Sequence, residues 1–165
     1  MKVLLVGHAV GPGRGSEPGN TWNFAARLSE SHQVTLISHP ERREDVEAEL
    51  ARHPRPNLRI IWVTPPPRID PWDPRKGDKG LRLHYMLWQR YALKMALRLC
   101  ETEQFDVAHH FSWGTVNAPP LLHKLPIPVV WGPIGGGQTS APEVFSSHGC
   151  DTRPVNKGER MYEGK

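Results

Sequence analysis

Apolar and polar positions along the chain change repeatedly between a strand-like and a helix-like spacing, which predicts strands and helices in alternation. Short apolar runs bounded by glycine, proline or polar residues are typical of buried parallel strands. Such runs occur at residues 2–6, 33–38, 57–63, 105–109 and 127–131. Helical spacing lies between them, at residues 20–30, 41–52 and 81 to about 103, and a short helix is expected within residues 115–124.

The expected helices differ in how much of their surface is apolar. Asn20 stands at the start of the first helix and has a side chain that commonly caps helices. In the second helix, Val46 and Leu50 stand four residues apart in a charged sequence, so one narrow side faces the core. The third helix is apolar around most of its circumference and should be buried on a wide face. The proline-rich, charged segment 64–80 before it is predicted to be irregular.

Strands that alternate with helices predict an α/β fold, a Rossmann-like parallel sheet with helices on both faces. The expected strand order is 3-2-1-4-5. Ligands of such sheets bind at the carboxyl ends of the strands where the order reverses, here after Val6 and after His109. We expect this single domain to span residues 1–144. Residues 145–165 carry no core pattern and are interpreted as an irregular tail or a truncated lead-in to a C-terminal domain.

Composition narrows the cellular setting and the partners. The two cysteines, Cys100 and Cys150, form no spaced framework, which favours reduced thiols in a cytoplasmic protein. The first apolar run ends at Val6, too early for a signal peptide, and no stretch approaches the roughly 20 apolar residues of a membrane span. The net charge is +4 without runs of Lys or Arg, so no nucleic-acid partner is expected. Peripheral contact with the inner membrane face is compatible with this charge.

The first loop of interest runs from Gly7 to Gly19 and contains five glycines, and it is too long for the tight turn of a dinucleotide-binding motif. Glycines let a backbone approach a ligand closely, and the N-terminus of the following helix attracts anions. The loop lacks the last glycine of GxGxxG, and no GxxxxGK[ST] motif exists. A flexible surface loop is the alternative. The candidate substrate-binding residues here are Gly15, Ser16, Glu17, Pro18, Gly19 and Asn20.

The second loop follows the fourth strand, where His109 and His110 are adjacent. Successive side chains of a strand point to opposite faces, so one histidine can face the cleft while the other packs. We take both as candidate catalytic residues, because an imidazole can hydrogen-bond a sugar hydroxyl or accept a proton near neutral pH. A purely structural role is the alternative. A zinc site built from them and His8 lacks supporting ligand spacing, so no metal is expected.

The third loop follows the fifth strand and reads WGPIGGG, from Trp131 to Gly137. Three consecutive glycines allow a backbone turn beside a bound ligand or in a hinge. Gly135, Gly136 and Gly137 are therefore added to the candidate substrate-binding residues.

Three segments together resemble the group-1, GT4-type retaining glycosyltransferases of the GT-B fold. They are GSEPGNTW at residues 15–22, FDVAHHFSWG at residues 105–114 and VVWGPIGGG at residues 129–137, in the family's order. The resemblance implies that this domain binds mainly the acceptor, with residues 15–20 close to the acceptor or the donor phosphates. It also implies that His109, with His110 as its neighbour, contacts the transferred sugar.

The family's C-terminal domain binds the nucleotide and carries an E-x7-E acidic pair, and this sequence contains no second Rossmann unit that would correspond to it. The expectation is therefore the N-terminal half of a hexosyltransferase that uses a nucleotide-sugar donor and a carbohydrate or lipid-linked acceptor, without a cofactor. The half is expected to be inactive unless a C-terminal domain or partner chain supplies the stabilisation of the diphosphate leaving group.

Two other functions stay open from the residues. One is a stand-alone, non-catalytic module that binds a sugar or an anionic ligand. The other is a small nicotinamide-dependent Rossmann enzyme, although its dinucleotide fingerprint is broken between Gly11 and Gly19.

Overall fold

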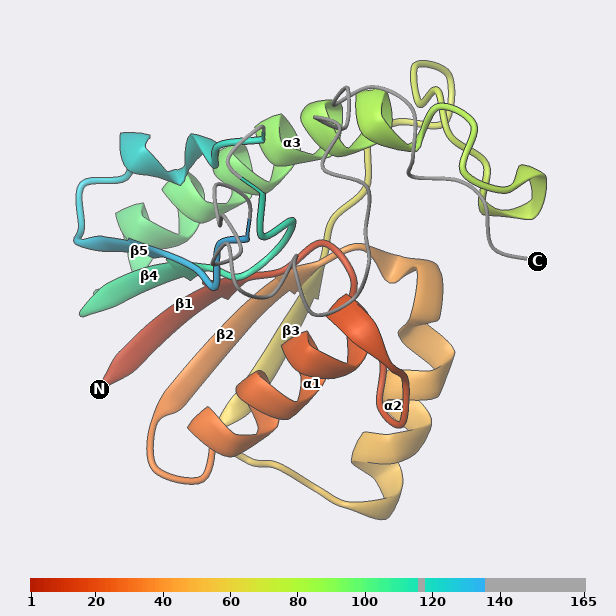
Figure 1. Ribbon diagram of the computed structural model, residues 1–165. Coiled ribbons are helices and arrows are strands. Elements are labelled where there is room, and N and C mark those ends of the chain that lie inside the picture. Colours follow the sequence, from red (N-terminus) through yellow and green to blue (C-terminus); the bar gives the residue numbers. More distant parts are fainter. Residues whose placement is uncertain (116–117, 136–165) are drawn as a thin grey trace, which may run out of the picture.

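A parallel β-sheet with helices on both faces forms the described part of the chain, residues 1–115 and 118–135 of the computed structural model (Figure 1). The order of the strands is β3-β2-β1-β4-β5, as the sequence predicts. Their bounds are β1 (Lys2–Val6), β2 (Gln33–Ser38), β3 (Leu58–Trp62), β4 (Val107–His110) and β5 (Val129–Trp131). All four neighbouring pairs are parallel, so their carboxyl ends meet at one edge.

The helices divide between the two faces of this sheet (Figure 1). Helices α1 (Ser16–Leu28) and α2 (Arg43–Arg52) cover one face, and the long α3 (Leu81–Thr102) covers the other. Single turns of 3-10 helix complete the connections: η1 (Pro40–Arg42), η2 (Pro74–Lys76) and η3 (Leu121–Lys124). Segment 64–80 is otherwise irregular, as predicted.

Side chains of β1 point alternately into two hydrophobic cores, one on each face of the sheet. Leu4 and Val6 pack with Tyr85 and Trp88 of α3, whereas Leu5 belongs to the core on the α1 and α2 side. Successive strand residues point to opposite faces, so a central strand that is apolar throughout supplies both cores. This explains why β1 reads as an unbroken apolar run.

Helix α1 begins four residues before Asn20, so the prediction that Asn20 caps this helix is wrong. The helix starts at Ser16, its N-cap is Gly15 without a side-chain hydrogen bond, and Asn20 is an exposed residue of the second turn. Pro18 does not interrupt the helix because the first four N–H groups of any helix have no partner within it. Residues 16–20 are therefore helix rather than loop.

The remaining boundaries differ by smaller amounts. Strand β4 is displaced towards the C-terminus, so that it includes His110, and β5 begins at Val129 rather than at residue 127. The short helix expected within residues 115–124 is the single turn η3. The expected tail, residues 145–165, lies outside the described residues.

Among the described residues, no helix combines the length and the apolar character that crossing a bilayer requires.

Candidate functional site

The loops after β1, β4 and β5 meet at the carboxyl edge of the sheet. The His8 backbone N–H donates a hydrogen bond to the Ser112 hydroxyl, which joins the first two loops. The Gly135 N–H donates to the Gly114 carbonyl at 2.5 Å, which joins the last two. A Cβ on Gly114 would come within 2.5 Å of the Pro133 carbonyl oxygen, so this close approach of two backbones needs glycine. The three sequence-predicted loops therefore form one surface.

Glu17 places a carboxylate at this junction. It lies in the first turn of α1, and burial raises the pKa of its carboxyl, opposed by hydrogen bonds from the Trp113 backbone and the Ser112 hydroxyl. One of its oxygens, Oε1, is buried without a hydrogen-bond partner. A buried acceptor of this kind is costly unless a ligand or solvent supplies a donor. Among the candidate residues predicted from the sequence, Glu17 therefore offers a buried carboxylate oxygen that can accept a hydrogen bond from a ligand.

Backbone strain is concentrated beside Glu17. Among the described residues, Ser16 and Trp113 are the non-glycine positions with positive φ, at 56° and 40°. Such conformations cost energy and persist where the surrounding structure enforces them, often at ligand sites. Both flank the contact between α1 and the loop after β4.

The adjacent histidines of β4 point to opposite faces, as predicted. His110 is 1% exposed on the α3 side, and its Nε2 lies 2.9 Å from the Tyr85 hydroxyl. His109 is half-buried on the α1 side, with its Nε2 donating to the Gly132 carbonyl at 2.8 Å and its ring against Phe24. His109 is therefore the histidine that a ligand can reach.

The charge state of His110 follows from its surroundings. Burial lowers the pKa of its imidazole to about 4, with a smaller contribution from the charge of His109 and an opposing hydrogen bond to the Ser112 backbone. The ring is neutral near pH 7 and serves as a hydrogen-bond partner of Tyr85.

The other predicted substrate residues have mixed placements. Gly15, Ser16 and Asn20 are exposed, whereas Gly19 is buried against the Arg14 carbonyl and supports the shape of the loop. Pro18 accepts a hydrogen bond from the Gly11 N–H at 3.0 Å through its carbonyl. Gly136 and Gly137 lie outside the described residues.

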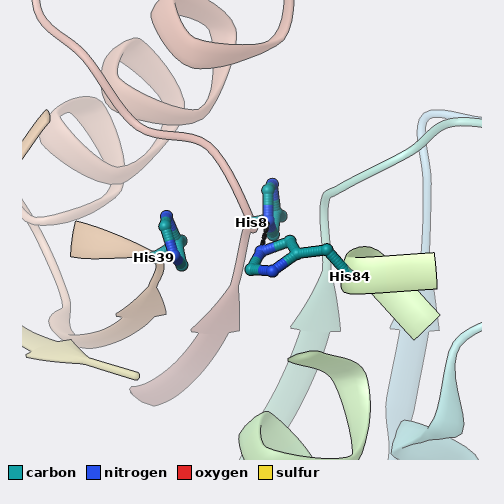
Figure 2. Close-up of side chains that lie close together, drawn as sticks. All are labelled: His8, His39 and His84. Carbon is teal, nitrogen blue, oxygen red and sulfur yellow. Dashed lines mark hydrogen bonds between the residues drawn. The ribbon is translucent and has the colours of Figure 1, made fainter. Parts of the chain in front are cut away.

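A second group of polar residues, which the sequence did not predict as a group, consists of His8, His39 and His84, drawn in Figure 2. They are at most 8% exposed, and one ring nitrogen of each lies within 4.8 Å of those of the other two. Burial lowers the pKa of His8 well below its ordinary value, aided by the charges of His39 and His84. Burial also lowers the pKa of His39 to about 4, aided by the charge of His84 and opposed by that of Asp70. The zinc set considered from sequence is not formed, because His109 and His110 have the separate partners Gly132 and Tyr85.

A scan of the chain against protein-family models finds no match, and a search of the curated proteins finds none either. The likeness to GT4-type transferases therefore rests on the three motifs and on their arrangement in the fold.

Proposed function

We propose that this domain is the acceptor-side half of a cytoplasmic, nucleotide-sugar-dependent glycosyltransferase. The carboxyl edge of the sheet binds a hydroxyl-rich acceptor between the start of α1 and the loop after β4. A donor-binding domain, in the same chain or in a partner, holds the nucleotide. Support comes from the three motifs of the sequence, which meet on this one surface.

The observation that carries the proposal is the unpartnered, buried Oε1 of Glu17. A carboxylate oxygen accepts hydrogen bonds strongly, and a sugar hydroxyl is a neutral donor of suitable size. Ser16, whose side chain is exposed, is the first residue of α1 beside Glu17, and the half-buried His109 lies near the end of β4, just before the loop that contains Ser112 and Trp113. This combination favours recognition of a carbohydrate.

The charge at the start of α1 disfavours a diphosphate there. A helix N-terminus attracts anions, but the Glu17 carboxylate already occupies the first turn of α1. Arg14 of the same loop is paired with Asp45, with Nη2 and Oδ2 3.0 Å apart. The phosphates of the donor are therefore assigned to the other domain, which matches the division of labour in GT-B enzymes.

The face of α3 gives room for an apolar part of the acceptor. A cavity of about 280 Å³ lies between α3 and residues that include Trp113, Ala118 and Leu121, and Met86, Arg82 and Arg90 of α3 line its other side. Cationic side chains beside an apolar cavity fit a lipid-linked acceptor with an anionic group.

His109 and His110 then have different roles. His109 is the candidate for contact with the transferred sugar, because it is the accessible member of the pair. His110 is a positioning residue, since its buried ring holds Tyr85, whose ring stacks on Trp113 with centroids 4.1 Å apart.

The test is a titration of the isotope-labelled chain with neutral hexosides and, separately, with UDP, UDP-glucose and GDP-mannose, followed by NMR. We expect hexosides to shift the resonances of residues 15–20 and 109–114, and nucleotides to bind weakly or not at all. Glu17→Gln should weaken hexoside binding about five- to tenfold, because one charged hydrogen bond is lost.

Glu44→Gln is the matched control, since Glu44 is an exposed glutamate in the first turn of α2 and not of α1. Tight nucleotide binding by this chain, or turnover by this chain alone, would overturn the division between acceptor and donor halves. Hexoside binding that Glu17→Gln leaves unchanged would remove the acceptor site from this surface.

A further inference from the structure

Three buried histidines from different elements converge behind the candidate sugar site. His8 follows β1, His39 follows β2 directly, and His84 is the fourth residue of α3. Figure 2 shows the rings side by side, with a hydrogen bond between His8 and His84. Within the described residues they are the one group of three or more His, Cys, Asp or Glu side chains that could hold a metal ion.

The spacing of the ring nitrogens is close to that of a metal site. Nε2 of His8 and Nε2 of His84 are 3.0 Å apart, and the three ligand atoms lie within 4.8 Å of one another. Nitrogens that bind a tetrahedral zinc ion at 2.0–2.1 Å are about 3.3 Å apart. Ring shifts on the order of 1 Å therefore suffice to bring all three to one cation.

Asp70 orients the His84 ring in the way that carboxylates orient metal-binding histidines. Its Oδ1 lies 2.7 Å from Nδ1 of His84. Nδ1 donates its proton to the carboxylate, so the lone pair of Nε2 faces His8. A carboxylate behind a ligating histidine fixes the tautomer and raises the basicity of the ligand.

His39 can release a nitrogen at small cost. Its Nδ1 accepts a hydrogen bond from the Glu41 N–H at 3.3 Å, and its Nε2 lies 3.2 Å from the Thr64 hydroxyl. Both contacts are long for hydrogen bonds, so a rotation of the ring exchanges one of them for a bond to a cation.

A pocket lies next to the histidine cluster, separated from the rings by its lining residues. It has a volume of about 630 Å³ and is bordered by segment 64–79. Three of its lining residues touch the histidines: Thr64 at His39, Asp70 at His84, and Trp72, whose ring centroid is 4.7 Å from that of His84. This is the side from which a cation would approach the rings, and a water molecule would fill the fourth position of a tetrahedral ion.

We propose that His8, His39 and His84 bind one divalent transition-metal cation of the zinc type, with Asp70 as the residue that orients His84. Three imidazoles favour Zn²⁺ and its neighbours over Mg²⁺ and Ca²⁺, which take oxygen ligands. The cation links the ends of β1 and β2 to the first turn of α3 and thereby fixes segment 64–80. This site is separate from the proposed sugar transfer and does not depend on it.

The proposal is tested on the full chain, purified without a histidine tag and stripped with a chelator. Calorimetric titration should show one equivalent of Zn²⁺, and Co²⁺ should give the strong visible absorption of a tetrahedral site. In the same protein, ¹⁵N spectra of the imidazoles should show Zn²⁺-dependent shifts of His8, His39 and His84. That last readout needs no variant, so it does not depend on whether a substituted chain folds.

Variants then assign the ligands. His39→Ala and His84→Ala should each abolish the Co²⁺ absorption, while His53→Ala, at an exposed histidine, should leave it unchanged. Asp70→Asn should keep the stoichiometry but weaken Zn²⁺ binding about 10- to 100-fold. The proposal is overturned if the unsubstituted chain binds no Zn²⁺, if binding survives both alanine substitutions, or if the shifted imidazoles belong to other histidines. In those cases the three rings form a hydrogen-bonded packing cluster.

Discussion

The Tyr85 hydroxyl lies 2.9 Å from Nε2 of His110, a bond that ties α3 to the end of β4 inside the protein. Tyr85 is fully buried and His110 nearly so. The ring of Tyr85 also stacks on Trp113, with centroids 4.1 Å apart and planes 6° from parallel. Through these two contacts Tyr85 of α3 holds the end of β4 and the following loop in place, and this loop borders the candidate sugar site.

Tyr85→Phe should lower the free energy of unfolding by about 1–3 kcal/mol, because it leaves a buried imidazole nitrogen without its partner. Urea denaturation measures this change. Tyr91→Phe is the matched control: Tyr91 is a partly buried tyrosine of the same helix, packed against the same core, and its substitution should change stability by less than about 0.5 kcal/mol. Equal effects of the two substitutions would show that the hydroxyl of Tyr85 contributes nothing specific.

The lowered pKa of His110 predicts a loss of stability in acid. The unfolded chain takes up a proton near the ordinary pKa of 6.5, whereas the folded protein resists protonation until about pH 4. Between these values the unfolded state binds more protons, so stability falls as the pH falls, by up to about 3 kcal/mol from this one residue.

Denaturation midpoints from pH 7.5 to pH 4, in a chelator to exclude cations, test this expectation. His110→Gln should flatten the curve without abolishing its slope, because His39 carries a shift in the same direction. A variant whose slope equals that of the unsubstituted protein would mean that His110 has the same pKa in the folded and unfolded states. The groups that face His110 are Tyr85, His109 and the Ser112 backbone.

The architecture could be predicted from the sequence because its signals are local. The apolar runs of β1 and β2 and the wide apolar face of α3 each lie within one segment, and right-handed crossovers then restrict the strand order. The start of α1 could not be predicted in the same way. Its N-cap is Gly15, which contributes no capping side chain, and Pro18 resembles a helix breaker although it is tolerated in a first turn.

The candidate sites were harder to predict because they depend on distances between segments. Glu17 belonged to the predicted loop, but the sequence could not show that its carboxylate is buried against Trp113 and Ser112, or that Oε1 has no hydrogen-bond partner there. No motif in the sequence groups the three histidines, since His39 and His84 are isolated in the chain. One usable hint was that His8 and His39 each follow a strand at the same edge of the sheet.

Trp88 offers a test of the core on the α3 side. It is fully buried, and its Nε1 donates to the Val63 carbonyl at 2.9 Å. Trp88→Phe removes this donor and leaves a cavity, so the free energy of unfolding should fall by about 2–4 kcal/mol. Thermal or urea denaturation measures the loss. A change below about 1 kcal/mol would indicate that water or a rearranged side chain replaces the indole.

Gly19 and Gly15 form a natural pair for testing the shape of the loop before α1. A Cβ on Gly19 would lie 1.8 Å from the Arg14 carbonyl oxygen, whereas a Cβ on Gly15 would meet nothing within 4 Å. Because the clash involves backbone, Gly19→Ala must displace the loop, and we expect it to cost about 1–3 kcal/mol of stability and to reduce hexoside binding more than tenfold. Gly15→Ala keeps a φ of −81°, which alanine adopts readily, and should change stability by less than about 0.5 kcal/mol. If the two variants bound hexosides equally well, the conformation of this loop would be irrelevant to the ligand, and the acceptor would have to be recognised elsewhere.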